Sequence, residues 1–155
     1  MKRESVWDYP RPAICEPFHG TLEIVHDGGV LARTVAAYRT LETSHPPTYY
    51  FPPEDVDMDR LERNGYRTRC EWKGEAHYFD LRARGSLIRN AAWTYREPTP
   101  PFSPIRGYLS FYASRVDACY VNDEHVRAQA GDFYGGWITA NLLGPFKGAP
   151  GTSGW

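Results

Sequence analysis

The chain has 155 residues, a length typical of one domain that can bury its own apolar core. Its 18 basic and 19 acidic side chains leave a formal net charge of −1, so no overall electrostatic field favours nucleic acid or an anionic membrane surface. Aromatic residues make up 15% of the chain, and such side chains both fill cores and line ligand pockets.

The cysteines and histidines lack the spacing of a metal site. Cys15, Cys70 and Cys119 are far apart, no CxxC pair occurs, and no two histidines have the spacing of a metal pair. We therefore expect no metal and no cofactor, and reduced thiols predict a cytoplasmic location. The N-terminus lacks the apolar stretch of a signal peptide, and no apolar run approaches the roughly 20 residues that span a bilayer.

Proline and glycine divide the chain into three parts. The predicted organisation is an extended N-terminal arm at residues 1–20, a single β-rich domain at 21–143 and a Gly/Pro-rich C-terminal tail at 144–155. The arm should lie on the domain, because Trp7 and Tyr9 would be costly to leave in water. The last ten or so residues of the tail should be mobile or should pack on a neighbouring subunit.

Several strands are predicted in the domain. TLEIV alternates apolar and polar residues, and the following His-Asp-Gly-Gly is a strong hairpin signal, so we expect strands at about 21–26 and 30–43. The run GYLSFYASRVDACYVN, at 107–122, is rich in β-branched and aromatic residues. It predicts another strand, with a helix as the alternative for its second half.

The stretch SHPPTYYFPPEDV, at 44–56, combines four prolines with three consecutive aromatic residues. Its first Pro-Pro pair excludes a helix, whereas the second, followed by acidic residues, predicts a short helix at about 53–63. Prolines restrict the backbone in advance, so this loop can hold aromatic rings at low entropic cost on binding. Neighbouring side chains should point to opposite sides, with Tyr50 lining a cavity and its neighbours anchoring the loop in the core.

The clearest β segment runs from YRTRCEW to NAAWTY, with a turn at Gly85-Ser86. If those two residues are central in the turn, Tyr78 faces Trp93, His77 faces Thr94 and Glu75 faces Arg96. Residues 60–96 also carry 9 basic and 4 acidic side chains. One interpretation is solvated arginines on the outer face of the strands, and the other is an anion-accepting groove.

Four strings in the chain, LETSHPPTYYFPPEDV, CEWKGEAHYFDL, NAAWTYREP and GYLSFY, resemble one family. It is the uncharacterised bacterial and fungal group known as domain-of-unknown-function family 427, sometimes labelled nucleotidyltransferase-like, and the resemblance covers Val6–Val126. The resemblance implies a mainly β fold of compact antiparallel sheets with one or two short helices, described as a β-tent or Mss4-like fold. It implies no known reaction, and the absence of CxxC pairs argues against the structural zinc of better-known β-tent proteins.

The nucleotidyltransferase label would require paired carboxylates that hold Mg²⁺. Asp55 and Asp57 have a DxD spacing, but in the first turn of a helix residues two apart point roughly 200° away from each other. We therefore interpret them as charges at a helix end rather than as a metal clamp.

The densest cluster of reactive side chains lies in CEWKGEAH, at 70–77. On a strand, Glu75 and His77 share a face and could act as general acid and base. The alternative is that Glu75 pairs with Arg96 and that His77 is a hydrogen-bonded sheet residue. Cys70 could be a nucleophile if a neighbouring cation stabilised its thiolate, but a lone strand cysteine is more often a small buried residue.

The leading hypothesis is a pocket between the Pro46–Pro53 loop and the Cys70–Tyr95 sheet that binds a small anionic organic ligand. The predicted ligand-binding residues are His45, Tyr50, Arg69, Trp72, Lys73, Asn90 and Trp93. Lys73 and Arg69 would attract the anionic group, and a tryptophan would stack on a flat or apolar part. Two alternatives stay open: a hydrolase or isomerase that uses Glu75 and His77 as acid and base, and an interaction module that forms a homodimer through its aromatic arms.

Overall fold

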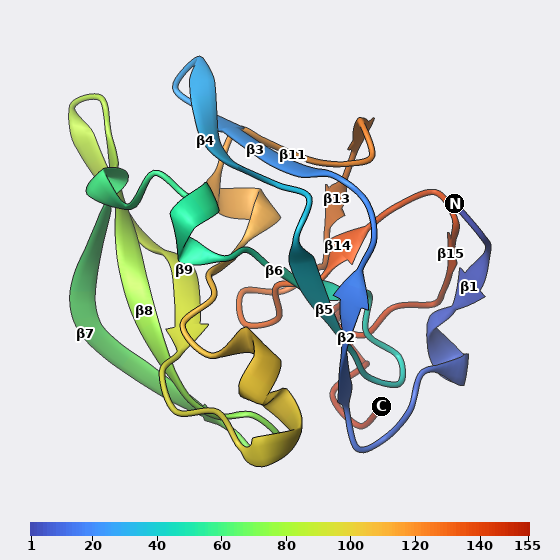
Figure 1. Ribbon diagram of the computed structural model, residues 1–155. Coiled ribbons are helices and arrows are strands. Elements are labelled where there is room, and N and C mark those ends of the chain that lie inside the picture. Colours follow the sequence, from blue (N-terminus) through green and yellow to red (C-terminus); the bar gives the residue numbers. More distant parts are fainter.

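Residues with β-branched, aromatic and alternating patterns fold into short strands (Figure 1). The computed structural model describes residues 1–155. The strands are β1 (Glu4–Ser5), β2 (Ile14–Phe18), β3 (Leu22–His26), β4 (Gly29–Thr34), β5 (Ala37–Leu41), β6 (Thr48–Tyr50), β7 (Leu61–Cys70), β8 (Gly74–Ala83), β9 (Ser86–Tyr95), β10 (Ser110–Phe111), β11 (Ala118–Val121), β12 (Glu124–His125), β13 (Arg127–Ala128), β14 (Trp137–Ile138) and β15 (Leu142–Leu143). The helices are all of the 3-10 type: η1 (Val6–Asp8), η2 (Pro53–Asp55), η3 (Met58–Arg60), η4 (Pro100–Ile105) and η5 (Ala113–Arg115). The fold is mainly β, as predicted, and no helix has the length and apolar character needed to cross a membrane.

Three antiparallel sheets form the body of the molecule. The large sheet has the strand order β10-β9-β8-β7, the second sheet β12-β11-β3-β4 and the third sheet β2-β5-β6. In addition, β13 pairs with β14, and β1 pairs with β15 in a parallel ladder. Figure 1 shows β7, β8 and β9 on one side of the molecule and both chain termini on the other. The finer β-tent arrangement implied by the family resemblance stays a prediction.

Strand β6 lies between two apolar clusters. Tyr49 and Phe51 belong to the main core, where their ring centroids lie 5.4 and 6.0 Å from that of the fully buried Trp137. Tyr50 faces the other way and joins a second cluster, rich in aromatic residues, that includes Trp93. Because successive side chains of a strand face opposite sides, one short segment anchors the proline-rich loop and also contributes to the second cluster.

Two of the predicted elements are divided differently in the structure. The predicted strand at 30–43 is two strands, because Thr34 Oγ1 accepts a hydrogen bond from the Ala36 N–H (2.9 Å) at the point where the chain passes from the second sheet to the third. The second half of the run at 107–122 holds η5 and β11, so the α-helix considered there does not form.

The predicted helix at 53–63 is wrong. Its residues form the single turns η2 and η3, and β7 already begins at Leu61. Between the two turns, Val56 pairs with Ala32 of β4. This tertiary pairing draws the backbone into an extended conformation and overrides the local helix-start signal of the prolines and acidic residues.

The β8–β9 hairpin has the predicted pairing in the half that is farther from the turn and a shifted pairing next to the turn. The pairs Tyr78–Trp93 and His77–Thr94 are confirmed. The turn itself is Arg84-Gly85 rather than Gly85-Ser86, and a register shift between Phe79 and Leu81 restores the predicted pairing beyond it.

The N-terminal arm and the tail pack on each other within one chain. The Trp7 ring lies edge-on to Trp155 (centroids 5.3 Å apart), and the Trp7 Nε1–H donates a hydrogen bond to Pro145 O (2.8 Å). Thr152 in the tail is buried. The tail thus packs on the arm of its own chain.

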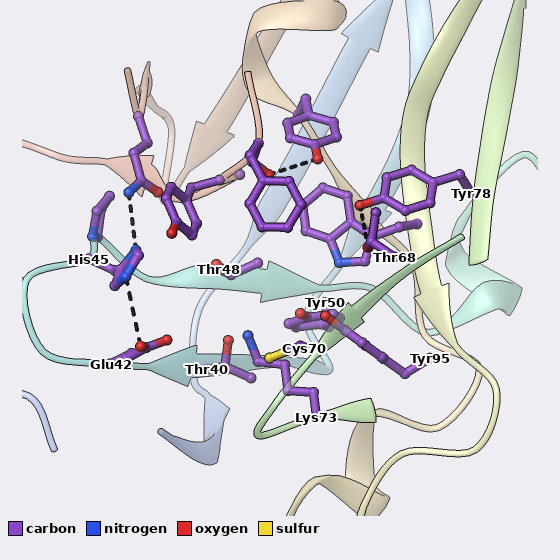
Figure 2. Close-up of a pocket in the computed structure, with 17 residues that line it drawn as sticks. Thr40, Glu42, His45, Thr48, Tyr50, Thr68, Cys70, Lys73, Tyr78 and Tyr95 are labelled. Carbon is purple, nitrogen blue, oxygen red and sulfur yellow. Dashed lines mark hydrogen bonds and ion pairs between the residues drawn. The ribbon is translucent and has the colours of Figure 1, made fainter. Parts of the chain in front are cut away.

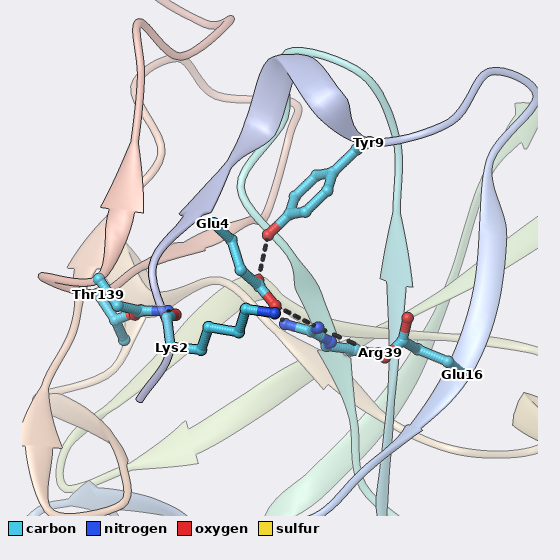
Figure 3. Close-up of polar contacts among 7 residues, drawn as sticks. Lys2, Glu4, Tyr9, Glu16, Arg39 and Thr139 are labelled. Atoms are coloured by element: carbon cyan, nitrogen blue, oxygen red, sulfur yellow. Dashed lines mark hydrogen bonds and ion pairs between the residues drawn. The ribbon is translucent and has the colours of Figure 1, made fainter.

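An ion pair holds the arm to β5 (Figure 3). Glu4 Oε1 and Oε2 accept hydrogen bonds from Arg39 Nη1 and Nη2 (3.0 and 2.9 Å), and Oε1 also accepts one from the Tyr9 hydroxyl (2.7 Å). The hydrogen bond from Arg39 lowers the pKa of Glu4. Only 12% of the Arg39 side chain is exposed, and its charge is compensated mainly by Glu4 and also by Glu16, whose Oε2 lies 3.4 Å from Arg39 Nη2.

We expect Glu4→Ala to lower the free energy of unfolding by about 1–3 kcal/mol. The variant leaves the largely buried Arg39 guanidinium with only the longer contact to Glu16 (3.4 Å). Glu23→Ala is the matched control, since it removes a carboxylate from Arg33, whose side chain is 56% exposed, and such a pair contributes about 0–1 kcal/mol. Urea denaturation of both variants measures the difference. Equal losses would show that the Glu4–Arg39 pair does not anchor the arm.

Candidate functional site

A cavity of about 100 Å³ lies between the third sheet and the large sheet (Figure 2). From β5 and β6 it is lined by Thr40, Thr48 and Tyr50, and from the large sheet by Thr68, Cys70, Tyr78, Trp93 and Tyr95. Glu42, His45 and Pro46 line it from the loop between β5 and β6. Residues 129–136 add Gln129, Phe133, Tyr134 and Gly135. The cavity thus joins segments that are far apart in the sequence.

Lys73 lines the cavity from the turn between β7 and β8. The turn ends at the buried Gly74, whose φ of 109° favours glycine. Lys73 takes part in none of the ion pairs of the structure. Lys73 is half-buried, and because a lysine that is largely removed from water normally has a paired carboxylate, its unpaired charge is the first indication of an anion site.

Tyr50 supplies a second unpaired polar group. The residue is fully buried, and its hydroxyl lies near Lys73, Thr40 and Trp93 without making a hydrogen bond of good geometry to any of them. Burial raises the pKa of Tyr50, so the phenol keeps its proton at neutral pH. Burial acts to lower the pKa of Lys73, but its polar neighbours, among them the Glu42 carboxylate, raise it above the ordinary value, so the amine is protonated. Lys73 and Tyr50 thus place two hydrogen-bond donors in the wall of the cavity, one of them charged.

Gln129 holds His45 in one tautomer. Gln129 Oε1 accepts a hydrogen bond from the Gly136 N–H (3.0 Å) and its Nε2–H donates to Lys147 O (2.7 Å), which fixes the orientation of the amide. The same Nε2 therefore donates to His45 Nδ1 (3.2 Å), and the imidazole proton lies on Nε2. Burial and the nearby lysine charges lower the pKa of His45 to about 4, so the ring is neutral at physiological pH. Its Nε2 faces Glu42 Oε2 at 3.8 Å.

Residues 129–136 close one side of the cavity. The Tyr112 hydroxyl donates to Phe133 O (2.8 Å), and the Tyr134 ring lies edge-on to His45 (centroids 4.7 Å apart). Gly135 lies so close to the Trp93 ring that a Cβ atom there would overlap it. A glycine at this position is therefore required for the segment to lie against the large sheet.

The cavity brings together four of the predicted ligand-binding residues, His45, Tyr50, Lys73 and Trp93. Trp72 packs beside the aromatic cluster without lining the cavity. Asn90 lies elsewhere: its Oδ1 accepts a hydrogen bond from Asn64 Nδ2 (2.6 Å), and its N–H donates to Asp80 Oδ1 (2.9 Å). The polar partner that an amide in this sheet requires is thus supplied by the protein itself.

A separate polar groove is lined by Arg69, Glu75 and His77, together with Arg96 and Arg106. In it Glu75 Oε1 lies 3.3 Å from His77 Nε2 and 3.6 Å from Arg67 Nη1. The expected pair of Glu75 with Arg96 does not form, because β9 ends at Tyr95. Glu75 and His77 alternate with the cavity-lining Tyr78 along β8, so they point away from the cavity.

Sequence reasoning missed Glu42, Gln129 and Tyr134. Glu42 could have been predicted, because it lies three residues before His45 and so can contact the histidine locally. No local signal existed for the other two, because their position depends on how the Gly-rich segment folds over the sheets. Asp55 and Asp57 do not line the cavity, and no group of three or more His, Cys, Asp or Glu side chains could hold a metal ion.

His45 should make stability depend on pH. Its pKa is about 4 in the folded protein and roughly 6.5 in the unfolded chain, so between these values only the unfolded chain takes up the proton. Stability should therefore fall by on the order of 3 kcal/mol as the pH drops from about 6.5 to about 4. Urea denaturation across this window should show a smaller fall for His45→Gln, whereas His19→Gln, at an exposed histidine, should retain the full fall. If the free energy of unfolding depended on pH in the same way in all three proteins, His45 would not be the group that titrates in this window.

Gly135→Ala should displace either residues 129–136 or the Trp93 ring. We expect a loss of about 1–3 kcal/mol in the free energy of unfolding, because the new methyl group overpacks the contact. Gly154→Ala meets no atom within 4 Å and should be close to neutral. The near-ultraviolet circular dichroism of the tryptophans should change only in the first variant, and an unchanged spectrum there would count against the contact.

The comparisons with known proteins are consistent with the sequence resemblance. Residues 14–122 match the model of a family described as a domain of unknown function, DUF427. A search of curated proteins finds no match. The matched region contains Lys73, Tyr50 and the strands that line the cavity, and it ends before Gln129. Because the match covers more than two thirds of the chain, the protein belongs to the DUF427 family.

Proposed function

We propose that the protein binds a small anionic organic ligand in the cavity between the third sheet and the large sheet. The observation that carries this proposal is the pair of unpaired donors, the Lys73 ammonium and the buried Tyr50 hydroxyl. A carboxylate or similar anion would accept a hydrogen bond from each and would compensate the lysine charge. The Trp93 and Tyr95 rings would contact the apolar part of the ligand.

The size of the cavity limits the ligand. Its volume of about 100 Å³ is well below the roughly 300–1,000 Å³ of sites that enclose drug-sized ligands. A compact organic acid fits this space, whereas a nucleoside triphosphate would lie mostly outside it. The cavity therefore supports small-molecule binding more than the nucleotidyltransferase label.

An enzymatic role for Glu75 and His77 on the same ligand has less support. Those side chains line the separate polar groove, where Glu75 already contacts His77 and Arg67. The interaction-module alternative is also weakened, because Trp7 and Trp155 pack on each other. The three free thiols support a cytoplasmic location for the binding role.

Lys73→Met tests the proposal, because it keeps the length of the side chain and removes its charge. We expect acetate, propionate and isobutyrate to raise the melting temperature of the wild-type protein, and their affinity for the variant to fall about 10- to 100-fold. Without ligand, the variant should be as stable as the wild type or more so, because an unpaired charge has been removed.

Lys2→Met, which alters a lysine in the exposed N-terminal residues, is the control and should bind the acids like the wild type. Differential scanning fluorimetry and isothermal titration calorimetry supply the two measurements. Equal affinities of the Lys73→Met and Lys2→Met variants would refute the proposal.

A further inference from the structure

Two charges of opposite sign line the cavity, and neither has a charged partner. Lys73 forms no ion pair, and Glu42 contacts a basic side chain only at His45, 3.8 Å away. Lys73 and Glu42 do not pair with each other either. Figure 2 shows Thr40 in view between them, with Tyr50 and Cys70 beside Lys73.

The contact with His45 does not neutralise Glu42. Gln129 donates a hydrogen bond to His45 Nδ1, so the ring is held with a single proton, on Nε2. Protonation of Nδ1 would place two donors against each other and would break this hydrogen bond. Burial also lowers the pKa of His45, which keeps the ring neutral. The Glu42 carboxylate therefore faces a neutral N–H group at 3.8 Å and has no cationic partner in an ion pair.

A ligand with one charge would compensate only one of the two side chains, Lys73 or Glu42. A simple carboxylate at Lys73 would leave Glu42 unpaired and would add a second negative charge to the same small cavity. A ligand with both a carboxylate and an ammonium group would match both. Only 25% of the Glu42 side chain is exposed, so its charge would interact with such an ammonium group more strongly than a surface carboxylate would.

We propose that the ligand of this cavity is a small zwitterion whose carboxylate is bound by Lys73 and Tyr50 and whose ammonium group is bound by Glu42. This inference rests on the proposed function and specifies its ligand class. The aromatic lining, which includes Tyr134 and Trp93, agrees with it, because aromatic rings attract an alkylated ammonium group. A cavity of about 100 Å³ admits amino acids of the size of alanine or proline, or glycine betaine.

Matched pairs of ligands test the inference by isothermal titration calorimetry. In each pair the two compounds have nearly the same shape, and only the first carries a positive charge: alanine and isobutyrate, proline and cyclopentanecarboxylate, glycine betaine and 3,3-dimethylbutyrate. For at least one pair, the wild-type protein should bind the zwitterion at least about tenfold more tightly than its isostere. This is the effect expected of one charge-assisted interaction. Because this comparison uses the unaltered protein, it does not depend on the folding of a variant.

Variants assign the preference to the two charges. In Glu42→Gln the affinity ratio within the pair should fall to about one, because the amide keeps the shape and loses the charge. Glu71→Gln is the control, since Glu71 is an exposed carboxylate in the same turn as Lys73 that does not line the cavity, and it should keep the wild-type ratio. Lys73→Met should weaken both members of the pair.

The outcomes separate this inference from the proposed function. If the anions bind and no zwitterion binds tighter than its isostere, the zwitterion inference is wrong and the anion site stands. An unchanged ratio in Glu42→Gln would also overturn the inference, because Glu42 would then not hold the ammonium group. If neither member of any pair binds the wild-type protein, both proposals fail.

Discussion

The alternation of side chains along β6 and the residue that follows it, Phe51, is the constraint on which the rest of the structure depends. Tyr49 and Phe51 enter the main core, and Tyr50 between them reaches the aromatic cluster beside the cavity. Backbone hydrogen bonds of 2.8 Å in both directions join Phe51 to Leu109, just before β10, and so connect this segment to the large sheet. Because the flanking prolines leave the backbone little freedom, the same three residues fix the core and one wall of the cavity.

This constraint could be predicted from the sequence because it is local: the period of two in a strand needs no knowledge of the partner. The same alternation also predicts that the aromatic cavity and the polar groove lie on opposite faces of the large sheet. With Tyr78 opposite Trp93 and His77 opposite Thr94, the aromatic pair and the histidine must lie on opposite faces of the sheet. The prediction that Glu75, His77 and Trp93 line one pocket was therefore inconsistent with the predicted register, which places Trp93 on the opposite face from the other two.

Other features could not be predicted, because they depend on contacts between distant segments. Nothing local in the Gly-rich run that follows β13 indicates that Gln129 will set the tautomer of His45, 84 residues earlier. The residues at 53–63 carry a genuine helix-start signal, yet the pairing of Val56 with Ala32 prevails over it. The family match ends at residue 122, so the wall formed by residues 129–136 lies outside the region that the resemblance could inform.

The two sites differ in the burial of their charges more than in the reactivity of their residues. In the polar groove, Glu75 contacts a histidine and an arginine, and the arginines that form no ion pair, Arg69, Arg96 and Arg106, are exposed to water. In the cavity, an ammonium group lacks a carboxylate and a buried hydroxyl lacks an acceptor, and both raise the free energy of the folded chain. Contacts such as Trp93 with Tyr112, with ring centroids 4.7 Å apart, offset part of that cost. Uncompensated polar groups at the centre of a well-packed aromatic cluster reduce stability without improving the packing, which is the pattern of residues positioned to bind a ligand.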